Sequence, residues 1–225
     1  LGATRSSHGE HLQVAHPKYI AIRTDARLEL RRLAALLRQG FAEEPAQKWL
    51  YPGAWRRTLA TELWFRGMVR SAQLRGEVWR LDDFSSVAVS FPPGAYFAPS
   101  GLPRLLLSLL SAQSRSSRRR KKALDAELAA RFPTEPSWYL AAIATERSHR
   151  NQGRASAVLR PILDRCDQTG VPIYLETSEL RSVALYEALG FTVRDTFTPS
   201  GGPKIICMHR RSRPPRSSGT ISDHD

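Results

Sequence analysis

Apolar residues recur along the first half of the chain with two different periods. Helical spacing runs over residues 24–40, where Thr24 or Asp25 can cap a helix, and again over residues 55–74. Prolines and a glycine between residues 45 and 53 interrupt the region between these two helices. Short alternating segments predict strands at residues 19–23, 77–80 and 85–90.

The second half of the chain predicts a regular alternation of strands and helices. A Pro/Gly-rich loop covers residues 91–103, and helical pieces at 102–110 and 123–132 flank a run of basic residues at 115–122, the basic run. Further strands are predicted at residues 138–145, 172–177, 191–196 and 204–209, and further helices at 151–168 and 183–189. This order, with antiparallel strands in between, indicates an α/β domain built on a mixed sheet.

The composition indicates one folded domain, at residues 18–210, between two tails. Residues 1–17 are polar and predict a disordered lead, and residues 211–225 predict a basic disordered tail. Hydrophobic residues make up 41% of the chain, which is enough for one sizeable core. No apolar stretch is long enough to cross a bilayer. The two cysteines lack metal-like spacing, so we expect a reducing, cytoplasmic setting and no metal.

The net charge of +13 indicates an anionic partner, which could be nucleic acid, an anionic cofactor or an acidic protein. Much of this charge is concentrated in the basic run and between residues 210 and 216. Such runs are typical of solvated, mobile segments. Neither run contains the aromatic residues on which single-strand binders stack bases. A non-catalytic nucleic-acid-binding module is therefore the less favoured alternative.

The junction between the strand at 138–145 and the next helix carries the strongest chemical feature. Arg150, Gly153 and Ala155 form an Arg-x-x-Gly-x-Ala turn in front of the helix. Small residues let a ligand approach the backbone, and the unpaired N–H groups of a helix start favour phosphate. Arg150 and Arg154 add positive charge. Taken alone, the pattern also fits a glycine that only relieves packing.

A second feature lies between Tyr186 and Phe191. Gly190 is expected to end a helix in the left-handed conformation, and Phe191 begins a buried strand. An isolated tyrosine at position 186 would ordinarily be a core residue. Its occurrence about 35 residues after the phosphate-type turn, within one β–α–β–α unit, favours a functional role as well.

Together the two features resemble the GNAT superfamily. Residues 143–155 are similar to its coenzyme A-binding motif, and residues 186–191 to its Tyr-x-x-x-Gly-Phe segment. Residues 135–210 also resemble the group of GNAT enzymes around puromycin N-acetyltransferase, which has a proline matching Pro161. The resemblance implies a mixed, mostly antiparallel central sheet flanked by helices, with its two central strands splayed.

The resemblance also implies an acyl-CoA-dependent N-acyltransferase. Its donor would be acetyl-CoA or another acyl-CoA. Its acceptor would be a small-molecule amine that attacks the thioester directly, such as an antibiotic or a biosynthetic intermediate. An alternative keeps the fold but takes the acyl group from an acidic carrier protein, which the basic excess leaves open. The cofactor-binding residues implied by the family are Ile143, Ala144, Thr145, Arg150, Asn151, Gln152, Gly153, Arg154, Ala155 and Ser182. Tyr186 would give a proton to the leaving thiolate.

The amine must lose a proton before or during attack, so a base is required. Acidic candidates are Glu176 at the end of a predicted strand, Glu146 just past the preceding strand, and Glu43 or Glu44 in the loop after the first helix. Glu176 is preferred because it would lie where the central strands diverge. Glu43 and the aromatic Trp49 are the predicted substrate-binding residues.

Overall fold

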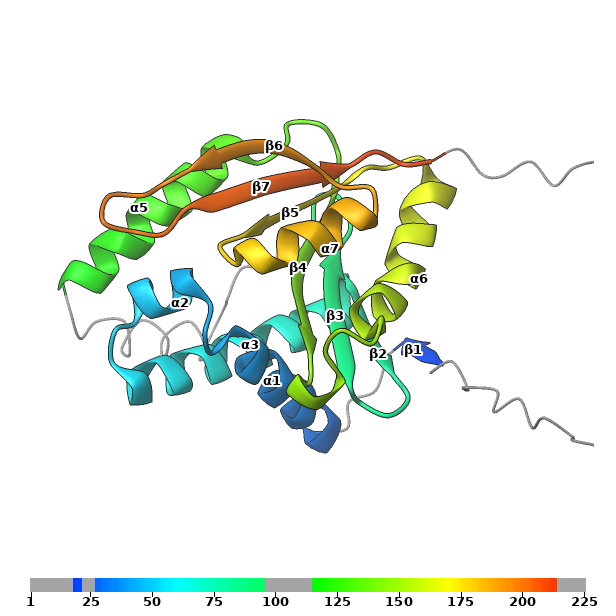
Figure 1. The fold of residues 1–225 in the computed structure, drawn as a ribbon, viewed down its shortest axis with the longest axis horizontal. Helices are drawn as coiled ribbons and strands as arrows, with labels where there is room; N and C mark the ends of the chain where they lie inside the picture. Colours follow the sequence, from blue (N-terminus) through cyan, green and yellow to red (C-terminus); the bar gives the residue numbers. More distant parts are fainter. Residues whose placement is uncertain (1–17, 22–26, 96–114, 214–225) are drawn as a thin grey trace, which may run out of the picture.

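The computed structural model describes residues 18–21, 27–95 and 115–213 of the chain (Figure 1). In this part of the chain, seven strands form one sheet of order β1-β2-β3-β4-β5-β7-β6. They are β1 (Tyr19–Ala21), β2 (Glu77–Leu81), β3 (Ser86–Phe91), β4 (Trp138–Thr145), β5 (Ile173–Thr177), β6 (Thr192–Phe197) and β7 (Ile205–Arg210). All neighbouring strands are antiparallel except β4 and β5. The predicted mixed, mostly antiparallel sheet is confirmed.

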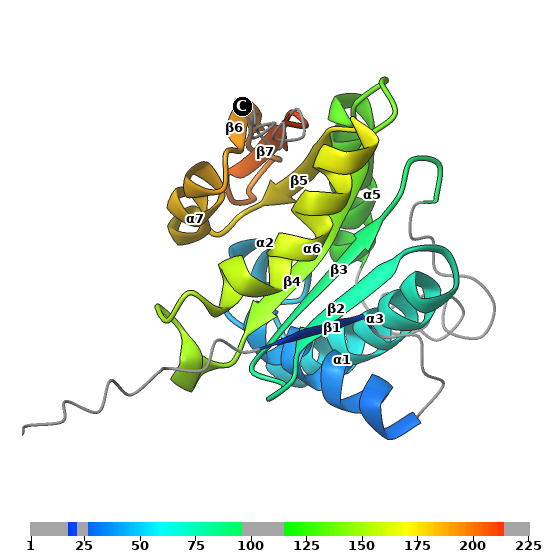
Figure 2. The same ribbon diagram turned by 90° about the vertical axis from the view of Figure 1, so that its right-hand side faces the viewer.

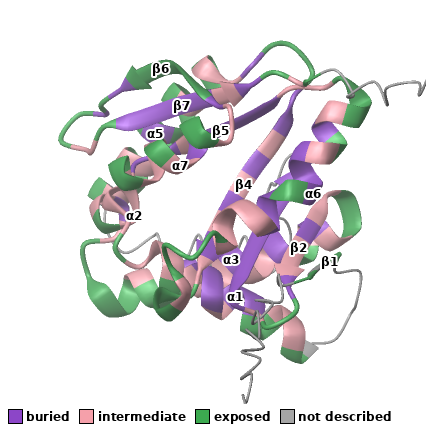
Figure 3. Cartoon of the chain, turned by 45° about the vertical axis from the view of Figure 1, so that its right-hand side comes forward, coloured by how far each residue is buried: buried purple, intermediate pink, exposed green. Residues whose placement is uncertain are grey.

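Helices cover both faces of the sheet. They are α1 (Arg27–Phe41), α2 (Pro45–Leu50), α3 (Ala54–Arg75), α5 (Arg115–Arg131), α6 (Arg154–Thr169) and α7 (Val183–Ala188). Helices α1 and α3 pack on one face, and α6 packs on the other (Figure 2). Helices α2 and α5 cover β5 and β7 on the side of α1. Buried residues accordingly lie on the strands and on the inner faces of the helices (Figure 3). No helix in these described segments is long and apolar enough to span a membrane.

A β-bulge in β4 changes which face its side chains point to. Val89 of β3 pairs with Ala142, but the next residue, Ser90, pairs with Leu140, so Ala141 is an extra residue in β4. Leu140 packs with the α6 side of the core, whereas Ala142 packs with the α1 side. In an unbroken strand, residues two apart share one face. The bulge therefore lets one strand serve both layers.

Strands β4 and β5 separate after a short parallel contact. They pair only at Trp138 with Ile173 and at Tyr139 with Tyr174 along their described lengths. The rings of Tyr139 and Tyr174 stack with centroids 6.4 Å apart, and Phe132 packs edge-on against both. Beyond this aromatic cluster the sheet opens into a fork between the two strands (Figure 1). The predicted splaying of the central strands is confirmed.

Two expectations about regular structure were wrong. The region around Pro45 contains α2, because proline at a first helical position costs no hydrogen bond. The basic run belongs to α5 and is not a solvated loop. Lysine and arginine have good helix propensity, and the Lys121 amino group pairs with Asp125 one turn later at 2.6 Å.

Smaller differences concern the ends of elements. Helix α6 begins at Arg154 and not at residue 151, because Asn151 and Gly153 have positive φ angles. The strand predicted at 19–23 is described only as β1. The cap at 24–25, the helical piece at 102–110 and the lead at 1–17 lie outside the described residues. In the predicted tail, the Arg213 N–H donates to Asp167 at 2.7 Å, and residues 214–225 lie outside the description.

Candidate functional site

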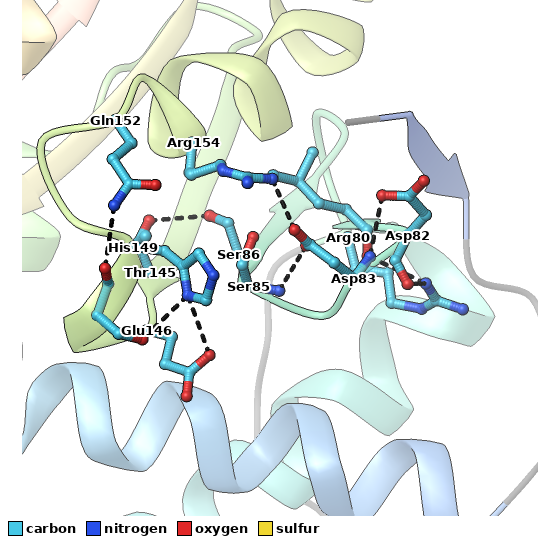
Figure 4. Close-up of polar contacts among 12 residues, drawn as sticks. Arg80, Asp82, Asp83, Ser85, Ser86, Thr145, Glu146, His149, Gln152 and Arg154 are labelled. Carbon is cyan, nitrogen blue, oxygen red and sulfur yellow. Dashed lines mark hydrogen bonds and ion pairs between the residues drawn. The ribbon is translucent and has the colours of Figure 1, made fainter. Parts of the chain in front are cut away.

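A cavity of about 420 Å³ lies at the fork, beside the loop that precedes α6. We call it the loop cavity. It brings together nine of the ten residues predicted to bind a cofactor: Ile143, Ala144, Thr145, Arg150, Asn151, Gly153, Arg154, Ala155 and Ser182. The exception is Gln152, whose side-chain amide instead donates to the carbonyl of Ser148 at 3.0 Å (Figure 4). Tyr186 also lines this cavity.

The loop presents backbone N–H groups because of its unusual backbone angles. Asn151 has φ 60° and Gly153 has φ 71°, both in the left-handed region. The first bond of α6 runs from the Ala157 N–H to the Gly153 carbonyl, so the N–H groups before it face the helix end. A Cβ on Gly153 would meet nothing within 4 Å. Glycine is thus favoured here by the backbone conformation and not by packing.

The two arginines predicted to supply charge differ in their surroundings. The Arg154 guanidinium pairs with Asp83 in the turn between β2 and β3 at 2.6 Å (Figure 4). Its positive charge is therefore largely compensated. Arg150 forms no ion pair within the described part of the chain, and its Nε lies 3.4 Å from the Thr145 carbonyl. Arg150 is the better placed of the two to attract an anion.

Tyr186 combines a core position with access to the loop cavity. Its ring is 6% exposed and packs edge-on against Phe191, with ring centroids 5.7 Å apart. Gly190, with φ 91°, ends the turn behind it, and the Phe191 N–H donates to the Tyr186 carbonyl. Burial and the charge of Glu44 hold the pKa of Tyr186 above its ordinary value, so its hydroxyl keeps its proton.

A second cavity, of about 200 Å³, lies on the α1 side of the sheet and contains Glu44 and Glu176. We call it the acid cavity. Gly40 lines the loop cavity and its neighbour Phe41 lines the acid cavity. In the same way, Glu179 lines the former and Ser178 the latter. The two cavities therefore adjoin where the sheet is forked.

Two acids in this cavity have strongly perturbed acidity. Burial raises the pKa of Glu44 and that of Glu176 from 4.5 to about 7. Ser178 Oγ donates to Glu44 at 3.0 Å and accepts from the Ala46 N–H at 3.1 Å. The Tyr139 hydroxyl contacts Glu176. Near neutral pH each carboxyl can exchange a proton, which is the property of a general base.

Three candidate residues lie away from both cavities. The Glu43 side chain is 73% exposed and pairs with Lys48. Glu146 is half exposed beside His149 (Figure 4). Trp49 packs near Gly202, with the Arg120 guanidinium 5.7 Å from its ring centroid. The predicted roles of Glu43 and Trp49 stay predictions.

Sequence reasoning gave too little weight to Glu44, Tyr139 and Ser178. A signal for Glu44 was Pro45, which starts α2 and so fixes Glu44 at the helix cap position. For Tyr139 and Ser178 no local pattern exists, because only the tertiary fold brings them to the acid cavity.

The forked sheet, with a phosphate-type loop on one strand of the fork, defines the fold class of the GNAT acetyltransferases. Residues 124–191 match the family model described as the acetyltransferase (GNAT) family. A curated relative, an uncharacterized N-acetyltransferase of Schizosaccharomyces pombe, is 29% identical over an alignment of 153 residues that covers 61% of this chain. The chain spans 59% of the length of that relative. Residues 124–191 of the chain therefore resemble the GNAT acetyltransferase family, and the fold around them is that of GNAT structures.

Solved structures share the fold. The structure described as histone acetyltransferase HPA2 and related acetyltransferase, from Corynebacterium glutamicum, is 22% identical with a TM-score of 0.65. The match covers 89% of this chain and 98% of that one. Arylalkylamine N-acetyltransferase 2 from Aedes aegypti is 13% identical with a TM-score of 0.55, and the match covers 87% and 99%. At these identities the likeness concerns architecture.

Gly153 allows a test of the loop as a phosphate site. Asparagine and aspartate have nearly the same shape, and both tolerate the left-handed conformation better than other side chains do. We expect Gly153→Asp to bind coenzyme A at least about tenfold more weakly than Gly153→Asn, because only the former adds a negative charge. Calorimetric titration measures both affinities. Equal affinities of the two variants would show that the phosphates of coenzyme A do not bind at this loop.

Glu44 and Glu43 are adjacent, so they form a matched pair for a stability test. Folding raises the pKa of Glu44 from 4.5 to about 7, so between these two pH values the folded state binds more protons than the unfolded state. The free energy of unfolding therefore falls as the pH rises from 4.5 to about 7, and this loss of stability stays constant above pH 7. We expect Glu44→Gln to be more stable than the parent at pH 8, by on the order of 1–3 kcal/mol, and similar to it near pH 4.5.

Glu43→Gln is the control in the same urea-unfolding series. Lys48 lowers the pKa of Glu43, so its replacement cannot stabilise the protein at pH 8. A Glu44→Gln variant whose stability follows that of the parent at every pH would show that Glu44 is not strained by burial.

Proposed function

We propose that the protein is an acyl-CoA-dependent N-acyltransferase that acetylates the amine of a small molecule. The observation that carries this proposal is the joining of two cavities at the fork. One has a phosphate-type loop and a protonated tyrosine, and the other has two acids whose pKa values lie near 7. Transfer to an amine needs all of these groups within reach of one another.

The residues of the loop cavity fit a coenzyme A thioester. The N–H groups at the start of α6 and the Arg150 guanidinium would hold the pyrophosphate. Residues 143–145 of β4 lie beyond the last pair with β5, and they line the loop cavity. Their backbone groups would pair with the amides of the pantetheine arm. When bound, the thioester supplies an activated acyl carbon and a thiolate leaving group.

The side chains at the fork would move the protons of the reaction. Glu176 or Glu44 accepts a proton from the incoming ammonium, which leaves a nucleophilic amine. Tyr186 gives a proton to the departing sulfur and recovers one from solvent. Nitrogen loses a second proton to the base or to solvent as the amide forms. Counted from the ammonium, the net change forms one C–N bond, breaks one C–S bond, places one proton on sulfur and releases one proton to solvent. Glu176 is the preferred base, as predicted from the sequence.

The placement of α5 bears on the choice of acyl donor. Arg120 donates to the Trp49 carbonyl at 2.9 Å, and Lys121 lines the acid cavity. The basic helix thus borders the cavity that would hold the amine and not the loop that would hold pyrophosphate. This supports free acyl-CoA over a carrier protein docked on the basic run. Binding to nucleic acid alone would leave Tyr186 and the two acids without a role.

The narrower proposal, that the acceptor is an antibiotic or biosynthetic intermediate, rests on the resemblance to the puromycin N-acetyltransferase group. The proposed cytoplasmic setting rests on the small number of cysteines. The curated relative and the solved structures are named as N-acetyltransferases or acetyltransferases. Those names support acetyl as the transferred group.

Tyr186→Phe tests the proposed acid. The variant should fold normally, because the ring packing against Phe191 is kept. It should lose about 10²-fold in kcat, the range typical of a removed general acid. Release of free thiol from acetyl-CoA, with an acyl-carrier thioester as the comparison donor, measures this. Full turnover in the variant would show that Tyr186 is not the general acid. If the protein turns over only the acyl-carrier thioester, the donor is a carrier protein and not acetyl-CoA.

The two acids can be separated by their pH–rate profiles. If Glu176 is the base, Glu176→Gln should lower the rate most near neutral pH and less at high pH, where more of the amine is already neutral. Glu44→Gln is the matched variant, since burial raises the pKa of both acids to about 7. If the pH–rate profile of Glu176→Gln is parallel to that of the parent, Glu176 is a structural residue and not the base. If only Glu44→Gln changes the profile, Glu44 is the base.

A further inference from the structure

We infer that the acid cavity selects a primary amine carried on a compact apolar body, with a single aromatic ring and a short chain as the best fit. The inference rests on the proposed function and names its acceptor class. It comes from the size of the acid cavity, from the position of its two acids next to the loop cavity, and from the charges at its rim.

The size of the cavity limits the acceptor. An engineered apolar cavity of about 150 Å³ holds benzene. The acid cavity, at about 200 Å³, has room for a ring and a short chain and not for several sugar rings. Phe41, Leu50, Trp64, Phe65 and Met68 form much of its wall. Such walls favour an apolar ligand, and a thioether side chain adapts to its outline.

The two acids and Ser178 lie together where the acid cavity adjoins the loop cavity. Glu44 comes from the cap of α2, and Glu176 and Ser178 come from the end of β5, next to the loop cavity. The apolar residues come from α1, α2, α3 and α5 and from β4 and β7, and further polar residues lie among them: Gln47, Thr61, Lys121 and Asp125. An amine would therefore place its ammonium at the acids and its apolar body between the helices. This orientation presents nitrogen to the fork.

Among the described residues, the rim offers no unpaired carboxylate to a second positive charge on the acceptor, because Asp125, which also lines the cavity, is paired with Lys121. Lys121 lies 5.6 Å from the ring centroid of Trp64, and its amino group is paired with Asp125 at 2.6 Å. A polyamine or an aminoglycoside would bring further cations against Lys121 and the apolar wall. Burying such charges without partners is unfavourable. A monoamine avoids this cost.

The first experiment compares acceptors with acetyl-CoA as the donor. The probes are 2-phenylethylamine, spermidine, kanamycin and a lysine-containing peptide. We expect kcat/KM for 2-phenylethylamine to exceed each of the others by at least about tenfold, the scale of discrimination by an apolar pocket. Preference for a polycation or the peptide would overturn the inference and leave the proposed function intact. If none of the four amines is acetylated, both the inference and the proposed function are overturned.

The second experiment changes the cavity itself. Ala60 lies in its wall on α3, whereas Thr58 is exposed on the same helix. Ala60→Leu should raise KM for 2-phenylethylamine at least about tenfold and leave KM for acetyl-CoA unchanged. Thr58→Leu, which adds the same side chain outside the cavity, should change neither. Equal effects of the two variants on the amine would overturn the inference.

A third variant guards against a folding defect in Ala60→Leu. Leu128 of α5 also lines the acid cavity, and Leu128→Ala enlarges it. The preference should then shift at least about threefold from 2-phenylethylamine towards tryptamine, whose indole ring is larger. Coenzyme A binding by calorimetry reports the folded state of each variant. An unchanged ratio in a folded Leu128→Ala protein would contradict the proposed position of the ring.

Discussion

One extra residue in a central strand determines where the site lies. Ala141 has no partner in β3, so the strand that places Leu140 towards α6 places Ala142 towards α1. Tyr139 lies on the α1 side and pairs with Tyr174, and there the contact between β4 and β5 ends. Beyond that point β4 has backbone groups that β5 does not satisfy, which makes room for a ligand with amides of its own. The bulge in β4, the fork between β4 and β5, and the two cavities at the fork therefore depend on one another.

The fork also explains how a six-residue helix contributes to the site. Helix α2 is too short to be stable alone. The Ala46 N–H donates to Ser178 at the end of β5, and the Arg57 side chain donates to the Tyr51 carbonyl beyond the last turn. Ser178 in turn donates to Glu44. The contact that holds the helix therefore also orients the acid, so structure and reactivity at this end of the fork depend on the same hydroxyl.

Periodicity predicted most of the strands and long helices because each of these buries one face. The loop before α6 was predictable because its chemistry is local: a positive-φ glycine and a helix start lie within a few residues. The bulge at Ala141 could not be predicted, because the sequence of β4 alone shows no extra residue. The extra residue becomes visible only in the pairing of β4 with β3. The basic run was assigned to a loop on charge alone, although its helix packs Leu124 into the core. Glu44 differs from Glu43 only through tertiary burial, which no local pattern records.

The two halves of the site also differ in what determines them. All residues that line the loop cavity except Gly40 fall within the family match at residues 124–191, and its loop offers backbone N–H groups. Much of the acid cavity wall comes from side chains of α1, α2 and α3, which precede that match. A backbone site tolerates changes of side chain, whereas a side-chain wall changes shape with each substitution. The family match therefore bears on the acyl donor much more strongly than on the amine. The acceptor has to be argued from the volume, the acids and the rim charges of this chain's own cavity.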